Sequence, residues 1–355
     1  MGIWYATREQ VKSSLEIAHS SWSDSLIGRK LESSSRSIEG FLHRRFYPER
    51  RTVRMDWPNL QSAATWQLWL ESEEIITLET LTSGGTTIPG SDRFLRRGDD
   101  RDEPPYSLIE IDLSTASAFG GGLTFQRSVS LLGVYGYDET NTSVPAHAQL
   151  GGNINSSVQS MVLNPLNGVF DVGVGSLIIM GTERMVLTER RMSDTTQNLQ
   201  TTMTDEQSDT IVDVTDGTAF AVGEIILLGT ERMRINDIAG NNLIVSRAWD
   251  GTVLTTHSAN EDVYALRTFT VQRGVLGSTA ASHTAAASTW AHDYGIVNEL
   301  CVAETVVALE QNSSAYARTV GSGANAREAS GAGLEDIRAR AMAARGRNGA
   351  RHAAV

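Results

Sequence analysis

The chain contains little cysteine, little positive charge and no long apolar run, and each shortage excludes a class of protein. Cys301 is the single cysteine among 355 residues, so no disulfide bond can form within the chain. The formal net charge is −12, which argues against a general affinity for nucleic acid, because binding to phosphates needs clustered Lys and Arg. No apolar stretch approaches the length that spans a bilayer, and the N-terminal MGIWYATREQ lacks the apolar run of a signal peptide. We therefore expect a soluble protein that stays on the cytoplasmic side, with no membrane partner.

Catalytic and metal-binding motifs are also missing from the sequence. The seven His residues are scattered, no HExxH is present, and a single cysteine excludes paired-Cys metal spacings. No Ser/His/Asp or paired-carboxylate arrangement occurs at a usable spacing. Cys301 lies in an apolar helical run, which favours a small core residue over a nucleophile. The sequence thus predicts no enzyme activity, no cofactor and no metal site.

A close internal repeat is the most informative feature that is present. Residues 174–187 read VGSLIIMGTERMVL and residues 222–235 read VGEIILLGTERMRI, with eight of fourteen positions identical. The second copy continues as LIVSRAWDGTVLTTHS (243–258), which shares Val, Arg, Gly and His positions with FTVQRGVLGSTAASHT (269–284). The first copy has no such continuation directly after it. The simplest explanation is that the second copy is inserted whole within the first.

This nesting divides the middle of the chain into two predicted β modules. Glycine turns and short strands at about ten-residue spacing are typical of small barrels or sandwiches. We assign residues 151–207 and 267–292 to an outer module, and residues 208–266 to an inner module nested in it.

Charged and titratable residues recur at equivalent positions of the two copies. Glu183 and Glu231 belong to the GTERM sequences, and His257 and His283 match in the continuations. We interpret the glutamates as cross-strand charges that pair locally, with a carboxylate at a ligand groove as the alternative. We interpret the histidines as hydrogen-bonded structural residues, in preference to ligands or switches.

The segments that flank the modules predict helices at both ends of the chain. Thr7 with Gln10 forms a capping-box pattern that opens a short helix through about Ala18. Apolar residues then recur at near-helical spacing from Ile27 until Pro48 stops the run. Helical patterns return at residues 296–316 and 333–345.

Between these helices, strand-like runs at residues 66–70, 75–81, 107–113 and 127–137 predict a small antiparallel sheet. We therefore predict a discontinuous host domain of residues 1–150 and 293–355, with residues 324–355 as a C-terminal arm.

Two basic segments are candidate contact sites. From Arg338 onward the chain carries five Arg and no acid, after a hinge rich in Gly, Ala and Ser. A frayed terminus and an arm that orders against an acidic partner are both open, although Arg favours bidentate contacts over simple solubility. HRRFYPERR (43–51) is basic with two aromatics, and we interpret it as a helix end and inter-subunit contact in preference to a nucleic-acid contact.

The host segments, taken in order, resemble the head-to-tail connector (adaptor) proteins of tailed bacteriophages. The similar segments are IEGFLHRRFYPE, LWLESEEIITLETLTSGG, RFLRRGDDRDEPPYSLIEIDL, RSVSLLGVYGYDETNTSVP and the long helix that begins near Val297. They cover somewhat under two-thirds of the chain, and the GTERM unit resembles a β module of phage structural proteins. The resemblance implies an α+β fold, a helical connector core with a small antiparallel sheet, interrupted here by the two nested all-β domains.

The resemblance implies a structural role in the neck of the virion, assembled in the host cytoplasm. Family members form a ring, commonly a dodecamer, beneath the portal protein, and the ring meets a stopper or tail-terminator protein. Genomic DNA passes through such a channel without specific binding, which suits an acidic subunit. The portal-binding residues would be Arg338, Arg340, Arg345, Arg347 and Arg351, and the inter-subunit contact would involve Arg44, Arg45, Phe46 and Tyr47.

An alternative function is a tail or baseplate binding module whose repeated β units recognise a host surface glycan. This reading predicts exposed aromatic residues in loops of the repeats. Trp249 of the second copy qualifies, but its counterpart in the first copy is Val275. A hydrolase has no support in the sequence.

Overall fold

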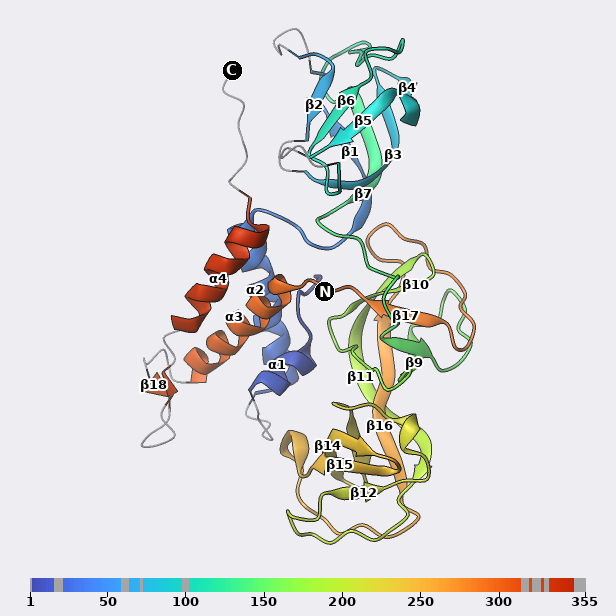
Figure 1. The fold of residues 1–355 in the computed structure, drawn as a ribbon, viewed down its shortest axis with the longest axis vertical. Coiled ribbons are helices and arrows are strands. Elements are labelled where there is room, and N and C mark those ends of the chain that lie inside the picture. Colours follow the sequence, from blue (N-terminus) through green and yellow to red (C-terminus); the bar gives the residue numbers. More distant parts are fainter. Residues whose placement is uncertain are drawn as a thin grey trace. The chain divides into compact units, whose positions relative to one another are not determined.

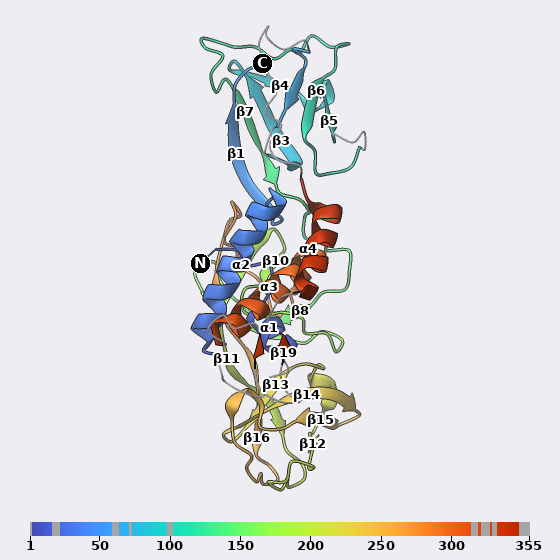
Figure 2. The ribbon, with the colours of Figure 1, turned by 90° about the vertical axis from the view of Figure 1, so that its left-hand side faces the viewer.

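The chain folds into two compact units. The computed structural model describes residues 2–15, 22–58, 64–70, 73–97, 102–313, 319–320, 327–328 and 332–347. Unit 1 comprises Met1–Arg36, Asn141–Val275 and Thr279–Ala339, and unit 2 comprises Ser37–Thr140, Leu276–Ser278 and Arg340–Val355. Figures 1 and 2 show the helices and strands from two directions.

The described helices are α1 (Arg8–Ser14), α2 (Asp24–Leu42), α3 (Ile296–Ser313) and α4 (Ala332–Arg345). The strands of unit 2 are β1 (Glu49–Met55), β2 (Gln67–Trp69), β3 (Ile75–Ser83), β4 (Thr86–Ile88), β5 (Arg93–Arg96), β6 (Leu108–Ile111) and β7 (Val129–Tyr135). Those of the repeat region are β8 (Ala148–Leu150), β9 (Ser160–Asn164), β10 (Leu177–Met180), β11 (Glu183–Asn198), β12 (Ile211–Asp213), β13 (Ile225–Leu228), β14 (Glu231–Ala239), β15 (Asn242–Ser246), β16 (Asp262–Gln272) and β17 (Ser288–Ala291). A further short pair is β18 (Thr319–Val320) with β19 (Arg327–Glu328).

An outer barrel of six strands forms the first part of the repeat region. Hydrogen bonds link β11, β10, β17, β8, β9 and β16 in that order, and β16 pairs again with β11 to close the ring. Closure leaves no unpaired edge strand, which protects a small sheet from pairing with other chains. Its interior is filled by apolar side chains, among them Leu163, Met185 and Phe269.

An inner barrel continues from the same two long strands. The distal half of β11 pairs with the first half of β16, and β16 leads through β13, β14 and β15 to β12. A bridge between Leu199 and Val214 brings the end of β12 back to the end of β11. A second apolar core, which includes Phe220 and Met233, fills this barrel. Residues between β11 and β16 therefore form a barrel of their own, which Figure 1 shows as the yellow segment, although in the sequence they interrupt the outer barrel.

Helices α1, α3 and the first part of α2 belong to unit 1 with the barrels. Thr7 caps α1 through a capping box with Gln10, as the sequence predicts. Asn298 of α3 donates hydrogen bonds to the Tyr5 carbonyl (2.8 Å) and to Gln10 (3.0 Å). Cys301 is fully buried, which confirms the prediction of a core residue.

Unit 2 contains two antiparallel sheets that share one apolar core. Their strand orders are β1-β7-β3-β4 and β2-β6-β5. Alternation along β7 points Val129, Leu131 and Tyr135 into this core, where they join Leu68 and Ile109 of the second sheet.

The predicted α+β fold with a helical connector core is wrong. Strands make up 36% of the chain and helices 21%, with four helices among the described residues and a six-stranded barrel. The structure has helices where the amphipathic patterns predict them, but it has more strands than the sequence predicts. β4 and β8 hold three residues each, too few to show an alternating pattern. β8 belongs to the outer barrel although it precedes residue 151, and the domain boundaries stay a prediction.

One helix ends before its expected position, and two other predicted ends cannot be compared. α2 ends at Leu42, before Pro48, because His43 adopts a left-handed conformation with φ of +54°. α3 ends at Ser313 in the described residues, and both the predicted end of α1 near Ala18 and most of the Gly/Ala/Ser hinge lie outside them.

Candidate functional site

The repeated GTERM glutamates are the centres of two equivalent buried polar clusters. Glu231 begins β14, and Arg247 directly follows β15, the strand that pairs with β14. Glu183 begins β11, and Arg273 directly follows β16, which pairs with β11. Each glutamate forms an ion pair with the arginine at the end of its neighbouring strand, and both glutamate side chains are fully buried. The predicted pairing with a neighbouring strand is therefore confirmed.

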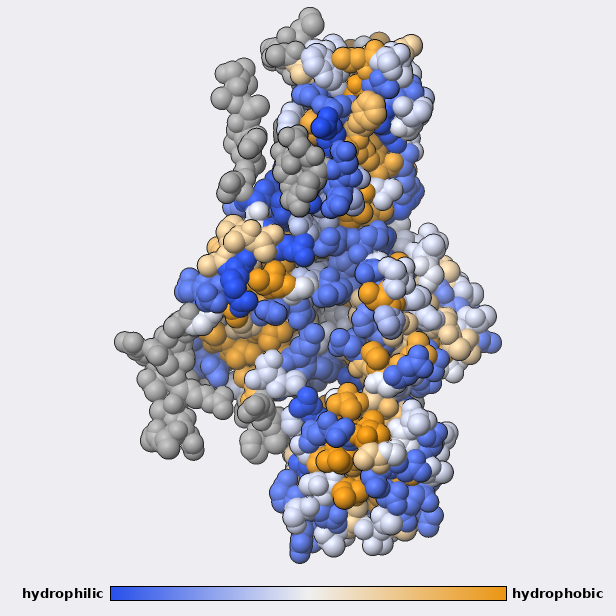
Figure 3. All heavy atoms as spheres, viewed as in Figure 1, coloured by the Kyte–Doolittle hydropathy of each residue, from blue (hydrophilic) through white to orange (hydrophobic). Residues whose placement is uncertain are grey.

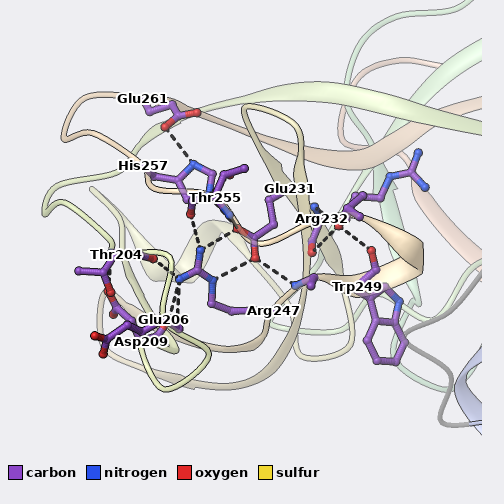
Figure 4. A network of polar contacts seen from close by, with 12 residues as sticks. Thr204, Glu206, Asp209, Glu231, Arg232, Arg247, Trp249, Thr255, His257 and Glu261 are labelled. Carbon is purple, nitrogen blue, oxygen red and sulfur yellow. Dashed lines mark hydrogen bonds and ion pairs between the residues drawn. The ribbon is translucent and has the colours of Figure 1, made fainter.

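In the inner barrel, five donors surround the Glu231 carboxylate (Figure 4). Its Oε1 accepts hydrogen bonds from Arg247 Nε (3.0 Å) and the Ala248 amide (3.0 Å). Its Oε2 accepts from Arg247 Nη2 (2.6 Å) and the Thr255 amide (3.1 Å), and lies 3.1 Å from His257 Nε2. An ionised carboxylate only accepts, so Nε2 of His257 carries the proton in this bond.

The outer barrel repeats this geometry donor by donor. Glu183 Oε1 accepts from Arg273 Nε (2.7 Å) and the Gly274 amide (3.1 Å). Glu183 Oε2 accepts from Arg273 Nη2 (2.7 Å) and the Ala281 amide (3.0 Å), and lies 2.8 Å from His283 Nε2. The prediction of two hydrogen-bonded histidines is confirmed.

Each arginine also fastens loops from two parts of its barrel. Arg247 donates to the carbonyls of Thr204 (2.5 Å), in the loop before β12, and Thr255 (2.7 Å), in the loop after β15. Arg273 donates to Val158 (2.9 Å) and Ala281 (2.5 Å) in the outer barrel. The structural repeat therefore extends upstream of the similar sequences. The loops that contain Val158 and Thr204 differ in sequence, but a carbonyl of each accepts a hydrogen bond from the equivalent arginine of its barrel.

The loop after each arginine has the same backbone conformation in both barrels. Asp250 and Leu276 are left-handed, with φ of +55° and +54°, and Gly251 and Gly277 follow at +77° and +76°. Non-glycine residues rarely adopt this conformation, so the shared strain marks one loop type that the shared glycine makes possible.

Both carboxylates stay ionised. Burial opposes ionisation of Glu183, but hydrogen bonds from Arg273, the Ala281 amide and His283 outweigh it and lower the pKa to about 2. Burial likewise opposes ionisation of Glu231, and hydrogen bonds from Arg247, His257 and two amides lower its pKa to about 2. Each carboxylate is a satisfied acceptor, which suits a structural fastening and leaves little capacity to act as a base or ligand.

The predicted inter-subunit residues are placed largely inside unit 2. Phe46 and Tyr47 are buried, with 3% and 8% of their surface exposed. Arg44 forms an ion pair with Glu74 (3.1 Å), and Arg45 lies 3.5 Å from Glu49. Arg44, Arg45 and Tyr47 line a cavity of about 260 Å³ together with these glutamates.

The predicted portal-binding arginines do not form one cluster. Arg338 pairs with Glu304 of α3 (3.0 Å), whereas Arg345 stacks over Tyr137 (4.6 Å to the ring centroid). The Arg347 amide donates to the Leu42 carbonyl (3.2 Å), and Arg340 also has contacts of its own. Arg351 lies outside the described residues.

Within the described ranges, no group of three His, Cys, Asp or Glu side chains is placed to hold a metal ion. Over the same ranges, none of the helices has the length and apolar character needed to cross a membrane. Comparison with protein-family models, curated proteins and solved structures finds no match to this chain.

Proposed function

We propose that the chain is a structural protein of the tailed-phage virion neck, without enzyme activity. In this proposal, copies form a homo-oligomeric ring beneath the portal protein, offer a docking surface to a stopper or tail-terminator protein, and continue the DNA channel.

One observation carries the proposal: three of the segments with the connector-like sequences contact one another through specific residues. Gly136 of GVYGY lies so close to the Tyr47 carbonyl of FYP that a Cβ there would be 2.4 Å from the oxygen. Gly133 of β7 admits the Thr77 carbonyl of β3, with a corresponding distance of 2.2 Å. Such approaches tolerate only glycine, so the contacts between these segments require glycine at both positions.

The third link is aromatic. Tyr137, which ends GVYGY, packs against Phe46 (5.7 Å between ring centroids) and lies beneath the Arg44 guanidinium (5.0 Å to the ring centroid). The net charge of −12 supports passage of DNA, because an acidic wall repels phosphates.

Native mass spectrometry of the full chain, alone and with the portal ring of the same phage, tests the proposal. We expect the portal to recruit a fixed number of copies greater than one. A small oligomer of unchanged mass, indifferent to the portal, would exclude a neck ring.

A groove in unit 1 favours a second candidate, recognition of a host glycan by the β modules. The groove has a volume of about 710 Å³, and half of its lining residues carry neutral amide or hydroxyl side chains, among them Gln149, Asn164, Ser193 and Gln197. These groups match the hydroxyls of a saccharide. Trp249, which the sequence predicted as an exposed aromatic residue for stacking on a sugar, is buried, with 8% of its surface exposed. Glycan-array binding that is lost in Asn164→Ala would favour this candidate, whereas no binding by the full chain would exclude it.

A further inference from the structure

The exposed aromatic side chains of the described residues all belong to unit 2. They are Phe41, Trp66, Trp69, Phe94 and Phe125, with exposures between 36% and 51%. The large exposed hydrophobic residues of unit 1 are valines and one isoleucine. Figure 3 shows apolar side chains in orange between hydrophilic ones on unit 2. Large exposed apolar side chains that gather in this way mark contact surfaces.

One group lies on the outer face of the sheet β2-β6-β5. In this sheet, Leu68 pairs with Ile109, and both point into the core. Side chains alternate along a strand, so Trp69 of β2 and Phe94 of β5 point to the opposite face. In register, Glu110 of β6 lies between Gln67 and Phe94, and Leu108 lies between Trp69 and Arg96. We name this surface the aromatic face; its residues are Gln67, Trp69, Phe94, Arg96 and Glu110.

The aromatic face has no excess of charge at its centre. Glu110 accepts a hydrogen bond from Gln67 Nε2 (2.5 Å) and pairs with Arg96 (3.3 Å). Two copies of a chain with net charge −12 repel one another, so they approach best where charge is locally balanced.

A second apolar group lies in the loop between β6 and β7. Leu113, Leu123 and Phe125 of this loop are exposed, and Leu123 has no cover at all. The loop, residues 112–127, reads DLSTASAFGGGLTFQR and carries one acid and one base. We name it the apolar loop.

The apolar loop is fixed to the unit. The Trp57 amide donates to the Phe125 carbonyl (2.8 Å), and Trp57 Nε1 donates to the Phe119 carbonyl (2.8 Å). Phe119 itself is buried in the core of the unit. The exposed side chains therefore stand on a defined surface, which limits the entropy lost when a partner binds.

We propose that the aromatic face of one copy docks on the apolar loop of a second copy. Two different patches on the same chain give a head-to-tail contact, and such contacts close into rings when the rotation allows. Both patches are uncharged overall, and each exposes aromatic side chains of the kind that dominate interface energetics: Trp69 and Phe94 on the aromatic face and Phe125 on the apolar loop. The inference rests on the proposed ring, and it moves the subunit contact from residues 44–47 to these two surfaces.

Two charge substitutions test the contact by native mass spectrometry of the full chain, alone and on the portal ring. Phe94→Glu alters only the aromatic face, and Leu123→Glu alters only the apolar loop. We expect each substitution to weaken self-association by more than about thirtyfold, the loss typical of an interface hot spot. Val253→Glu, an exposed apolar position of unit 1, is the matched control and should leave assembly unchanged. Circular dichroism confirms that each variant is folded.

Mixing the two variants separates this contact from other arrangements. Each mixed pair retains one intact aromatic face and one intact loop, so we expect a dimer that contains one copy of each variant and nothing larger. Self-association of Leu123→Glu alone would instead indicate a symmetric contact between two aromatic faces and overturn the proposal. Wild-type-like rings from both variants on the portal would overturn the contact and leave the neck function standing. A wild-type chain that stays monomeric with and without portal would contradict both.

Discussion

At the scale of single residues, the two buried carboxylates hold together strand ends and loops of their barrels through hydrogen bonds. A buried ion pair contributes little net stability when it replaces apolar packing, because both charges lose their hydration. Here each carboxylate also accepts backbone amides, and each arginine satisfies backbone carbonyls. Apolar substitution of the pair would leave those groups without partners, at about 1–3 kcal/mol each.

Glu231→Gln is expected to lower the free energy of unfolding by about 3–5 kcal/mol, because Arg247 would stay buried without a counter-charge. Glu261→Gln is the matched control: its carboxylate meets the same histidine at Nδ1 (3.1 Å) but is partly exposed, so about 1 kcal/mol or less should be lost. Urea denaturation of the full chain measures both. Equal effects would contradict a central role for Glu231.

The lowered pKa values predict acid sensitivity. Glu183 and Glu231 ionise at about 2 in the folded chain and at 4.5 as the ordinary value, so the unfolded chain binds more protons between these limits. Their stabilisation is complete above pH 4.5 and declines as the pH falls toward 2, by up to about 1.4 kcal/mol per pH unit for each carboxylate. Unfolding curves across this range check the slope, which Glu183→Gln should reduce. An unchanged slope in that variant would contradict the assignment.

Thr289 is a residue whose replacement should stabilise the protein. Its side chain is fully buried in β17, and its hydroxyl lacks a hydrogen-bond partner. Val263 occupies the equivalent position of the inner barrel. Thr289→Val is expected to raise the free energy of unfolding by about 1 kcal/mol, because a buried unsatisfied hydroxyl is removed. Thr305→Val is the control, since the Thr305 hydroxyl bonds Ser34 (3.2 Å) and its loss should destabilise. Thermal denaturation compares the two, and destabilisation by both would refute the idea.

At the scale of elements, α1 supplies a carboxylate that the outer barrel lacks. In the inner barrel, Glu224 accepts the Ala221 amide (2.8 Å) and pairs with Arg267 (2.8 Å). The outer barrel has Ser176 at the matching position. There Glu9 of α1 accepts the Val174 amide (2.8 Å), close to Arg190 (3.4 Å). The helix is therefore an integral part of the outer barrel and not a separate attachment.

Glu9→Ala should weaken this contact between α1 and the outer barrel locally. We expect hydrogen exchange at the Val174 amide to accelerate by about tenfold, the equivalent of about 1.4 kcal/mol, because the amide loses a charged acceptor. The Ala221 amide, held by Glu224, should be unaffected and serves as the internal control. Residue-resolved exchange by NMR measures both amides, and equal acceleration at both would indicate global destabilisation instead.

At the scale of the whole molecule, part of the basic C-terminal segment contacts the chain itself, since Arg338 pairs with Glu304 and Arg345 stacks over Tyr137. Truncation after Ser330 should abolish portal binding if this segment docks on the portal. Because the truncation also removes the Arg338–Glu304 ion pair, Glu304→Gln is the control: it breaks the pair but keeps every arginine, and binding should persist. Co-sedimentation with the portal ring measures both, and binding by the truncated chain would exclude the arm.

The sequence predicted the parts of the fold that have strong local signals. The capping box at Thr7, the GTERM pairing with a neighbouring strand and the hydrogen-bonded histidines all follow from short-range patterns or from comparison of the two copies. The pairing of Glu183 with Arg273 has no local signal, because ninety residues separate them and the inner barrel occupies most of that interval. The signal for this pairing is the comparison of the two continuations, in which the same Arg and His positions recur once for each GTERM copy.

The sequence by itself determined that a unit occurs twice, that it is rich in strands, and that Cys301 belongs to a core. Tertiary structure alone decided that the two copies share β11 and β16 and close into barrels, because closure depends on pairing between strands that are distant in sequence. It also decided which aromatic residues are exposed. Burial depends on what covers a side chain, so Phe46 and Tyr47 became core residues while Trp69 and Phe94 stayed at the surface.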